Sequence, residues 1–598
     1  MMKYNDTWDL EAVFPGGTKS AQLQGKINSI KTEIKEYEGL IRDANLKAVE
    51  SLQALIDLEE SISRSLRQVG TFITMYQSAY MDDEYAGVVM GQAVDLMVAM
   101  EKQMNRFIAK LVEIDHESWQ ALLETDELQA IAFRLNEKRE DGKRLRTEAE
   151  EEVIAELKKD GITAWSQLYD KTVGIMTIPF TDEEGVTSEL SVGQAMNRMY
   201  ADPDANVRAQ LFEQWEKAWA QYGPIFSHTI NHLAGSRLTL QKLAKRKDHL
   251  EEPLELNRMT KATLQAMWGA IEKNKEAFLQ YLDQKARLLG MEQLNWQDVD
   301  APISVGDYEA TKFTYDEAAD FILEHFSSFG EELTSFTKYA LTNRWVEAED
   351  RPNKRPGGYC ASLPEDKESR IFMTFTGSAN DVSTLAHELG HAFHSYVLRD
   401  VPYYNQQYAM NVAETASTFA ELIIQNATIE AAKSDEEKIS LLATKLESAT
   451  AMFLNIHARF LFEDSFYEER KEGFVAESRL NELMEAAQKE AYGNRLASYH
   501  PQFWSSKLHF FIENVPFYNF PYTFGYLFSL GIYAAYKANP NGFEEKYIAL
   551  LRDTGSMNVE DLAKKHLAVD MTDESFWTAG IELMIEDVEE FIKLTKKL

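Results

Sequence analysis

Long stripes of apolar residues at helical spacing are the feature that most limits what this chain can fold into. Residues three and four positions apart share one face of a helix, so a sustained stripe predicts an amphipathic helix. Three stripes lie in the N-terminal part of the chain, and they predict an antiparallel helical bundle in a mostly α-helical protein. They are Ile27, Ile30, Ile34, Tyr37 and Ile41; Ile62, Leu66, Val69, Ile73, Tyr76 and Tyr80; and Met90, Val94, Met97, Met104, Phe107 and Leu111.

The composition suits a large globular protein and excludes several partners. Hydrophobic residues make up 44% of the 598 positions, which is enough for a large core. The 62 basic and 97 acidic residues give a net charge of −35, which disfavours nucleic acids and anionic membranes. Cys360 is the only cysteine, so no intrachain disulfide can form. With no signal-like or membrane-spanning apolar run, we expect a cytoplasmic protein, and the sequence does not indicate its oligomeric state.

Two segments interrupt the helical pattern. Residues 173–180 and 186–190 predict extended chain on either side of the turn-forming residues 182–185. We therefore expect a boundary near residue 190, with an N-terminal helical region at 1–190 and a second domain at 191–598. Helical patterns resume after Asp204, which follows Pro203 and is a typical helix start.

The second interruption predicts a β-hairpin. Residues 357–363 and 371–376 are strand-like and flank a charged turn at 365–368. An edge strand in this place could bind an extended peptide through main-chain hydrogen bonds. Its first residues, Gly357, Gly358 and Tyr359, are therefore candidate substrate-binding residues.

Directly after the hairpin, the chain contains the pattern HExxH. His387 and His391 are four residues apart, so on a helix both rings can face one metal ion, with Glu388 beside them as a general base. A helix is expected here because Ser378, Asp381 or Ser383 could cap it and an apolar stripe continues through it. The pattern would arise by chance in about two chains in a hundred of this length.

A catalytic zinc ion usually has three protein ligands, so a third must be found downstream. A metzincin would need a glycine and a histidine where this chain has His394 and Val397, which excludes that class. The next strong helix is expected from about Met410 to Thr428, and its Glu414 is our predicted third ligand. Glu421, two turns farther along the same face, could accept a hydrogen bond from a ligand histidine or could be merely structural.

Two other histidine arrangements are alternatives. His394 lies one turn beyond His391 and could also reach the ion. His228 and His232 have the same four-residue spacing, but no acid is adjacent to serve as the base. We therefore expect a packing or surface role for this second pair.

An aromatic-rich segment from His509 to Tyr526 offers candidates that could stabilise the oxyanion of a hydrolytic reaction. We expect proline and glycine to break regular structure there. Taken singly, each tyrosine would more often be a core residue. As a group, His509, Tyr518, Tyr522 and Tyr526 present several polar tips close together in sequence.

These motifs resemble those of the oligoendopeptidase F family, within the thimet-oligopeptidase-like zinc peptidases. The resemblance rests on HELGHAFH at 387–394, on ETAS at 414–417 with Glu421, and on the tyrosine-rich segment after His509. It implies a mostly helical, two-lobed fold with a small β-sheet beside the HExxH helix and a deep substrate channel, in which residues 191–598 form the catalytic domain. It also implies one Zn²⁺ per chain.

For the active site, the resemblance implies that His387, His391 and Glu414 are the metal ligands and that Glu388 is the general base. The residues that bind substrate or the oxyanion would be His509, Tyr518 and Tyr522. We therefore expect a zinc endopeptidase that hydrolyses short unfolded peptides. The alternatives are a zinc exopeptidase and a non-catalytic peptide-binding protein.

Overall fold

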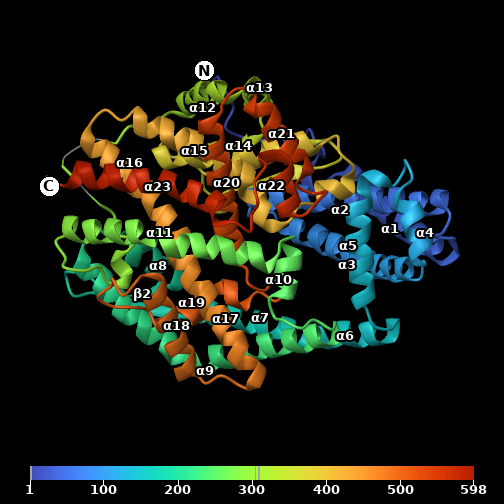
Figure 1. Ribbon diagram of the computed structural model, residues 1–598, viewed down its shortest axis with the longest axis horizontal. Coiled ribbons are helices and arrows are strands. Elements are labelled where there is room, and N and C mark those ends of the chain that lie inside the picture. Colours follow the sequence, from blue (N-terminus) through green and yellow to red (C-terminus); the bar gives the residue numbers. More distant parts are fainter. Residues whose placement is uncertain (1–2, 304, 307–309) are drawn as a thin grey trace. The chain divides into compact units, whose positions relative to one another are not determined.

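Helices dominate the computed structural model, which describes residues 3–303, 305–306 and 310–598 (Figure 1). The mostly α-helical fold is thereby confirmed. The chain forms two compact units, each assembled from three separate segments. Unit 1 comprises Met1–Glu148, Ala310–Thr428 and Ala535–Ala568, and unit 2 comprises Ala149–Glu309, Ile429–Ala534 and Val569–Leu598. The domain boundary expected near residue 190 stays a prediction.

Unit 1 begins with the three long helices that the apolar stripes predicted. Each of α1, α2 and α3 packs against the other two, and short loops join them, so the predicted bundle is confirmed. The helices of unit 1 are α1 (Ala21–Asp43), α2 (Val49–Ala79), α3 (Glu84–Val112), α4 (His116–Leu123), α5 (Ala132–Arg144), α12 (Tyr315–Phe329), α13 (Glu331–Thr342), α14 (Ala379–Leu398), α15 (Met410–Glu430, whose last two residues belong to unit 2), α21 (Phe543–Asp553) and α22 (Val559–Leu567).

The buried face of α3 differs from the predicted one. Val94 and Met97 belong to the predicted stripe, yet they are 47% and 38% exposed. The core contacts come instead from positions such as Val89, Leu96 and Met100. Apolar residues surround most of this helix, so packing against α1 and α2 decides which face is buried.

A small sheet in unit 1 packs against α14. Its strands are β3 (Val346–Glu347), β4 (Tyr359–Leu363) and β5 (Glu368–Phe372), in the order β3-β5-β4. The antiparallel pair β4 and β5 confirms the predicted hairpin, although β5 begins at Glu368 and ends at Phe372 rather than running over 371–376. Both β4 and β5 contact α14, which confirms the expected sheet beside the HExxH helix.

Unit 2 is also helical, with one separate hairpin. Its strands are β1 (Thr177–Thr181) and β2 (Thr187–Ser191). The extended segment expected from residue 173 starts later, because residues 173–175 complete helix α7. The helices of unit 2 are α6 (Glu148–Asp160, whose first residue belongs to unit 1), α7 (Ile162–Ile175), α8 (Val192–Ala201), α9 (Ala205–Leu243), α10 (Glu251–Leu256), α11 (Lys261–Leu288), α16 (Asp435–Thr450), α17 (Ile456–Glu472), α18 (Glu477–Ala491), α19 (Phe503–Ser506), α20 (Phe520–Ala538, whose last four residues belong to unit 1) and α23 (Glu574–Thr595).

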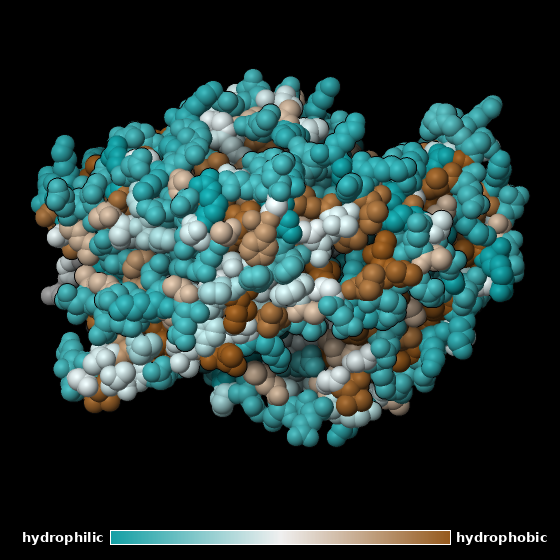
Figure 2. Space-filling view, turned by 90° about the horizontal axis from the view of Figure 1, so that it is seen from below, coloured by the Kyte–Doolittle hydropathy of each residue, from teal (hydrophilic) through white to brown (hydrophobic). Residues whose placement is uncertain are grey.

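The helix start predicted at Asp204 is confirmed. The Asp204 side chain accepts a hydrogen bond from the backbone N–H of Asn206 and so caps the 39-residue helix α9. Among the residues that the structure describes, every helix is too short or too polar to span a lipid bilayer. The molecular face in Figure 2 is mainly hydrophilic, in keeping with the large negative charge.

Candidate metal centre

Helix α14 carries the HExxH residues, and a capping box fixes where this helix begins. Ser378 caps it, accepting a hydrogen bond from the N–H of Asp381, while the Asp381 carboxylate accepts one from the N–H of Ser378. Leu385 and Leu389 are fully buried and anchor one face of the helix in the core of unit 1. His387 and His391 therefore follow one another along a fixed helix face, with ring centroids 4.9 Å apart.

Helix α15 approaches α14 closely enough for Glu414 to reach both histidines. The approach depends on Gly390, since a Cβ there would lie 2.4 Å from the carbonyl oxygen of Ala416 and 2.6 Å from the Cα of Ser417. Glu414 lies about one turn before this contact. Its Oε2 is 3.3 Å from His387 Nε2 and 3.5 Å from His391 Nε2.

The three residues form a donor set that fits zinc. One ligand atom from each of His387, His391 and Glu414 lies within 4.8 Å of the other two. Two imidazole nitrogens and one carboxylate oxygen, with a fourth position left for water, are typical of catalytic zinc. Burial would lower the pKa of His387, but its hydrogen bonds to two carboxylates outweigh this and raise the pKa to about 10. The same pairing holds the pKa of Glu414 well below its ordinary value despite burial.

Two neighbours orient these donors. Glu421 Oε2 lies 2.8 Å from His387 Nδ1, so of the two roles considered for Glu421 the geometry matches the hydrogen-bond acceptor. This contact leaves His387 Nε2 facing Glu414. Ser417 donates a hydrogen bond to Glu414 Oε2 at 2.9 Å. Ser417 was not among the predicted site residues, although its three-residue spacing from Glu414 on a helix could have indicated it.

Glu388 is buried beside these ligands. The residue is 6% exposed, and burial raises its pKa. Its Oε2 has no hydrogen-bond partner in the described part of the chain. A Cβ on Gly358 would come 3.5 Å from Glu388 Oε1, so the start of strand β4 lies next to this carboxylate. A carboxylate that is poorly solvated and weakly paired is a better base than one in water.

The hairpin residues divide into two groups. Gly357 and Gly358 directly precede β4, and Gly358 also lies near Glu388. Gly357 has a φ of 100°, which favours glycine. The Tyr359 side chain instead donates a hydrogen bond to Ser78 in α2 and stacks on Phe372. The side chain of Tyr359 is thus held by contacts within unit 1, and its backbone begins strand β4. In the described sheet, β4 pairs with β5 alone.

The alternative histidines lie elsewhere. His394 is fully buried, with its Nε2 2.9 Å from Thr554 Oγ1 and its ring stacked on Tyr408. It is not part of the donor set that His387, His391 and Glu414 form. In unit 2, His232 stacks on Trp165, and His228 packs near Phe474. The expectation of a packing role for the second pair agrees with these contacts.

The predicted aromatic residues meet one another in unit 2. The ring centroid of His509 is 5.3 Å from that of Tyr518 and 6.4 Å from that of Tyr522. Burial, together with Arg459 and Lys507, lowers the pKa of His509 to about 4, so the ring is neutral at neutral pH. No sequence pattern indicated these two cations.

The local structure of this segment corrects one expectation. Pro521 and Gly525 do not break regular structure but lie inside α20. Pro521 is the second residue of that helix, where its missing N–H is not needed. Tyr526 also lies in α20, and its hydroxyl contacts the sulfur of Met584.

Comparisons with known proteins agree with this arrangement. Residues 198–583 match Peptidase family M3, and residues 110–178 match Oligopeptidase F. Oligopeptidase PepF of Bacillus subtilis is 22% identical, and the alignment covers 100% of this chain and 88% of that protein. An oligoendopeptidase F homolog of Lactococcus lactis is also 22% identical, with 99% and 97% covered.

Solved structures share the fold. The crystal structure of oligoendopeptidase-F from Enterococcus faecium matches with a TM-score of 0.72 at 17% identity, over 96% of this chain and 99% of that one. A chain from Chlamydophila abortus matches with a TM-score of 0.84 at 21% identity, over 98% of each. The family match extends over more than half of the sequence and includes every residue of the candidate metal centre. This chain therefore belongs to peptidase family M3, the metallopeptidases that include oligoendopeptidase F.

Proposed function

We propose that this peptidase is a zinc-dependent endopeptidase that hydrolyses short unfolded peptides. One observation carries the proposal: His387 Nε2, His391 Nε2 and Glu414 Oε2 converge next to the buried carboxylate of Glu388. No described residue forms a hydrogen bond with the Oε2 of that carboxylate. Three ligands and an adjacent base are the minimum set for metal-assisted peptide hydrolysis.

Zinc held by these three residues would supply a Lewis acid and would lower the pKa of water from 15.7 to about 7. Glu388 then accepts the proton of the attacking water and passes it to the departing amine. Its burial favours this role, because the proton moves to a base with a raised pKa. Glu421 keeps His387 in the tautomer whose Nε2 carries the lone pair.

Peptide binding is assigned to two regions. Gly357 and Gly358 directly precede strand β4, and Tyr359 is its first residue. The backbone of this strand can bind an extended peptide by main-chain hydrogen bonds. His509, Tyr518 and Tyr522 are assigned to the substrate or the oxyanion. Their mutual contacts and the neutral state of His509 support this assignment. Removing one such donor typically costs about 3 kcal/mol of transition-state stabilisation, or a hundredfold or more in rate.

The direct test is Glu388→Gln, which keeps the shape of the side chain but removes the base. We expect near-normal zinc content and a loss of kcat of at least a hundredfold for a fluorogenic peptide. Glu430→Gln makes the same change of charge at an exposed position at the end of α15 and should retain activity. If Glu388→Gln retains both its zinc and its peptide hydrolysis, Glu388 is not the base.

Peptides of graded length with acetylated and amidated ends distinguish the alternatives. An endopeptidase cuts them at internal bonds, and mass spectrometry of the products identifies the bonds. Cleavage only of peptides with a free terminus would indicate an exopeptidase. If no peptide is cut and Zn²⁺ restores no cleavage to chelated protein, the peptide-binding alternative replaces our proposal.

A further inference from the structure

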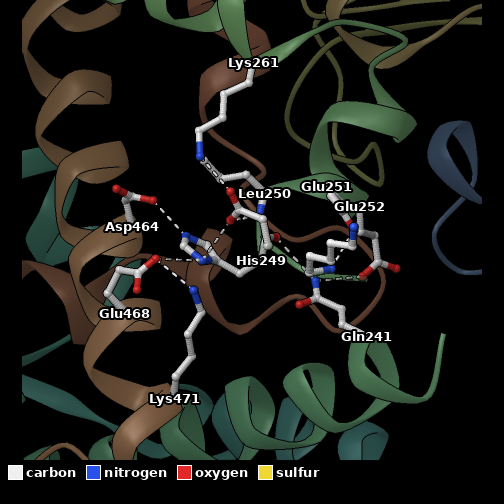
Figure 3. A network of polar contacts seen from close by, with 11 residues as sticks. Gln241, His249, Leu250, Glu251, Glu252, Lys261, Asp464, Glu468 and Lys471 are labelled. Atoms are coloured by element: carbon white, nitrogen blue, oxygen red, sulfur yellow. Dashed lines mark hydrogen bonds and ion pairs between the residues drawn. The ribbon is translucent and has the colours of Figure 1, made fainter. Parts of the chain in front are cut away.

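A second cluster of metal-binding side chains lies within unit 2. Asp248 and His249 are in the loop between α9 and α10, and Asp464 and Glu468 follow one another by one turn on α17. Figure 3 shows the His249 ring between the carboxylates of Asp464 and Glu468. One ligand atom each from Asp248, His249 and Glu468 lies within 4.8 Å of the other two.

The hydrogen bonding of the imidazole points to a cation. His249 Nε2 lies 2.7 Å from Asp464 Oδ1, where a carboxylate accepts and the ring nitrogen donates. In the neutral ring the other nitrogen, Nδ1, then carries the lone pair. It lies 3.3 Å from oxygens of both Asp248 and Glu468. A lone pair facing two carboxylates is repulsive unless a positive charge lies among them.

Among the residues that the structure describes, none forms a hydrogen bond with Nδ1, although the side chain is only 1% exposed. The two carboxylate oxygens that face Nδ1 at 3.3 Å are not aligned for a hydrogen bond with it. A metal ion would satisfy the Nδ1 lone pair and the two facing carboxylate oxygens together. The carboxylate of Asp464 behind Nε2 is the outer partner that metal-bound histidines usually have.

The ring cannot turn easily out of this position. It stacks on Tyr467 with ring centroids 5.6 Å apart and an interplanar angle of 11°, and on Phe517 at 5.6 Å and 28°. Gln241 donates a hydrogen bond to the backbone carbonyl of His249 at 3.4 Å. A preoriented donor loses little conformational entropy when it binds an ion.

Charge and access also favour a cation. Lys261 contacts Asp248 at 2.6 Å, and Lys471 contacts Glu468 at 2.8 Å. The cluster has a third carboxylate, that of Asp464, so these five groups together carry one net negative charge. Asp248, His249 and Lys471 line an open cavity of about 870 Å³, which gives ions access to the cluster.

We propose that Asp248, His249 and Glu468 bind a divalent transition-metal ion such as Zn²⁺, with Asp464 orienting the imidazole. One nitrogen and two oxygen donors suit zinc-like ions, and the imidazole disfavours Mg²⁺ and Ca²⁺. The bound ion would join the loop after α9 to α17. It would also fix the ring that stacks on Phe517, the residue before Tyr518.

Metal content tests the proposal. Chelated full-length protein is dialysed against a series of buffered Zn²⁺ concentrations, and the bound metal is measured by mass spectrometry. We expect wild type to bind one equivalent more than Glu468→Gln at saturation. Because the result is a difference, it does not depend on whether the HExxH site is loaded. Glu468 is 58% exposed, so this variant should fold normally.

Three further variants sharpen the test. His249→Asn should lose the same equivalent, whereas Asp464→Asn should keep it with about 10–100-fold weaker affinity. Glu469→Gln neutralises the adjacent acid, which pairs with Arg479, and should behave as wild type. The proposal is overturned if wild type and Glu468→Gln bind equal amounts of zinc, or if Glu469→Gln loses as much as Glu468→Gln.

Discussion

Replacing Gly390 by alanine should separate the two helices that form the metal centre. The new Cβ would be 2.4 Å from the carbonyl oxygen of Ala416, whereas ordinary contacts begin at 3.4 Å. The obstructing atoms belong to the backbone of α15, so no side-chain rotation can relieve the overlap. Either helix must move by about 1 Å, and the movement takes Glu414 away from His387 and His391.

The size of this movement sets the expected effects. Metal–ligand distances tolerate about 0.2 Å, so a shift of about 1 Å effectively removes Glu414 from the site. Zinc affinity should fall by more than the 10–100-fold that is typical of losing an outer partner. Overpacking should cost about 1–3 kcal/mol of unfolding free energy, against a gain of about 1 kcal/mol from replacing glycine in a helix.

A matched substitution isolates the overlap. Gly87 lies within helix α3, and apart from the backbone of its own helix no described atom lies within 4 Å of its Cβ position. Gly87→Ala should therefore gain about 1 kcal/mol of unfolding free energy and leave zinc binding unchanged. Urea unfolding of the metal-free proteins and competition with a zinc chelator measure the two effects. If Gly390→Ala is stabilised like the control and retains wild-type zinc affinity, close packing at Gly390 does not position Glu414.

Three other substitutions test separate parts of the structure. Glu421→Gln should weaken zinc binding by about 10–100-fold in chelator competition, because His387 loses its charged acceptor; unchanged affinity would contradict this role. Burial raises the pKa of Glu463 to about 7, above its ordinary 4.5. The folded protein therefore holds this proton more tightly than the unfolded chain, and the stability that Glu463 contributes below pH 4.5 is lost as the pH rises through 7. In urea unfolding, the free energy of unfolding of Glu463→Gln should therefore rise by about 3 kcal/mol relative to that of wild type between pH 4.5 and pH 8. If the two proteins have parallel pH profiles, this reasoning is refuted. Asp298→Asn leaves Arg208 buried and unpaired at 1% exposure, which should cost about 3–5 kcal/mol; replacing Arg208 by methionine as well should recover much of this loss, and a neutral single variant would show that the ion pair is not needed.

Local features of the metal centre were predictable from sequence because they depend on neighbours in the chain. The four-residue spacing of His387 and His391 fixes their relative positions on any helix, and Ser378 caps that helix through a contact three residues away. Glu414 was a harder inference, since it required α15 to turn back onto α14. The structure brings these groups together, while their roles in catalysis remain predictions.

Features that depend on tertiary packing were not predictable in the same way. Helix α3 has apolar residues on several faces, so hydropathy alone could not identify Val89 rather than Val94 as buried. Pro521 suggested a break, yet its place in the first turn of α20 makes it compatible with the helix. The cluster at His249 also escaped notice, because its ligands come from segments more than 200 residues apart.

The interleaved segments of unit 1 have a consequence for synthesis on the ribosome. The helix that carries HExxH packs against α21, and the His394 ring bonds to Thr554, both from the last segment of that unit. At about 5–20 residues per second, translation through residue 568 takes roughly half a minute to two minutes. Until then unit 1 lacks its final layer and exposes apolar surface, so the nascent chain needs protection from aggregation before the metal centre can be completed.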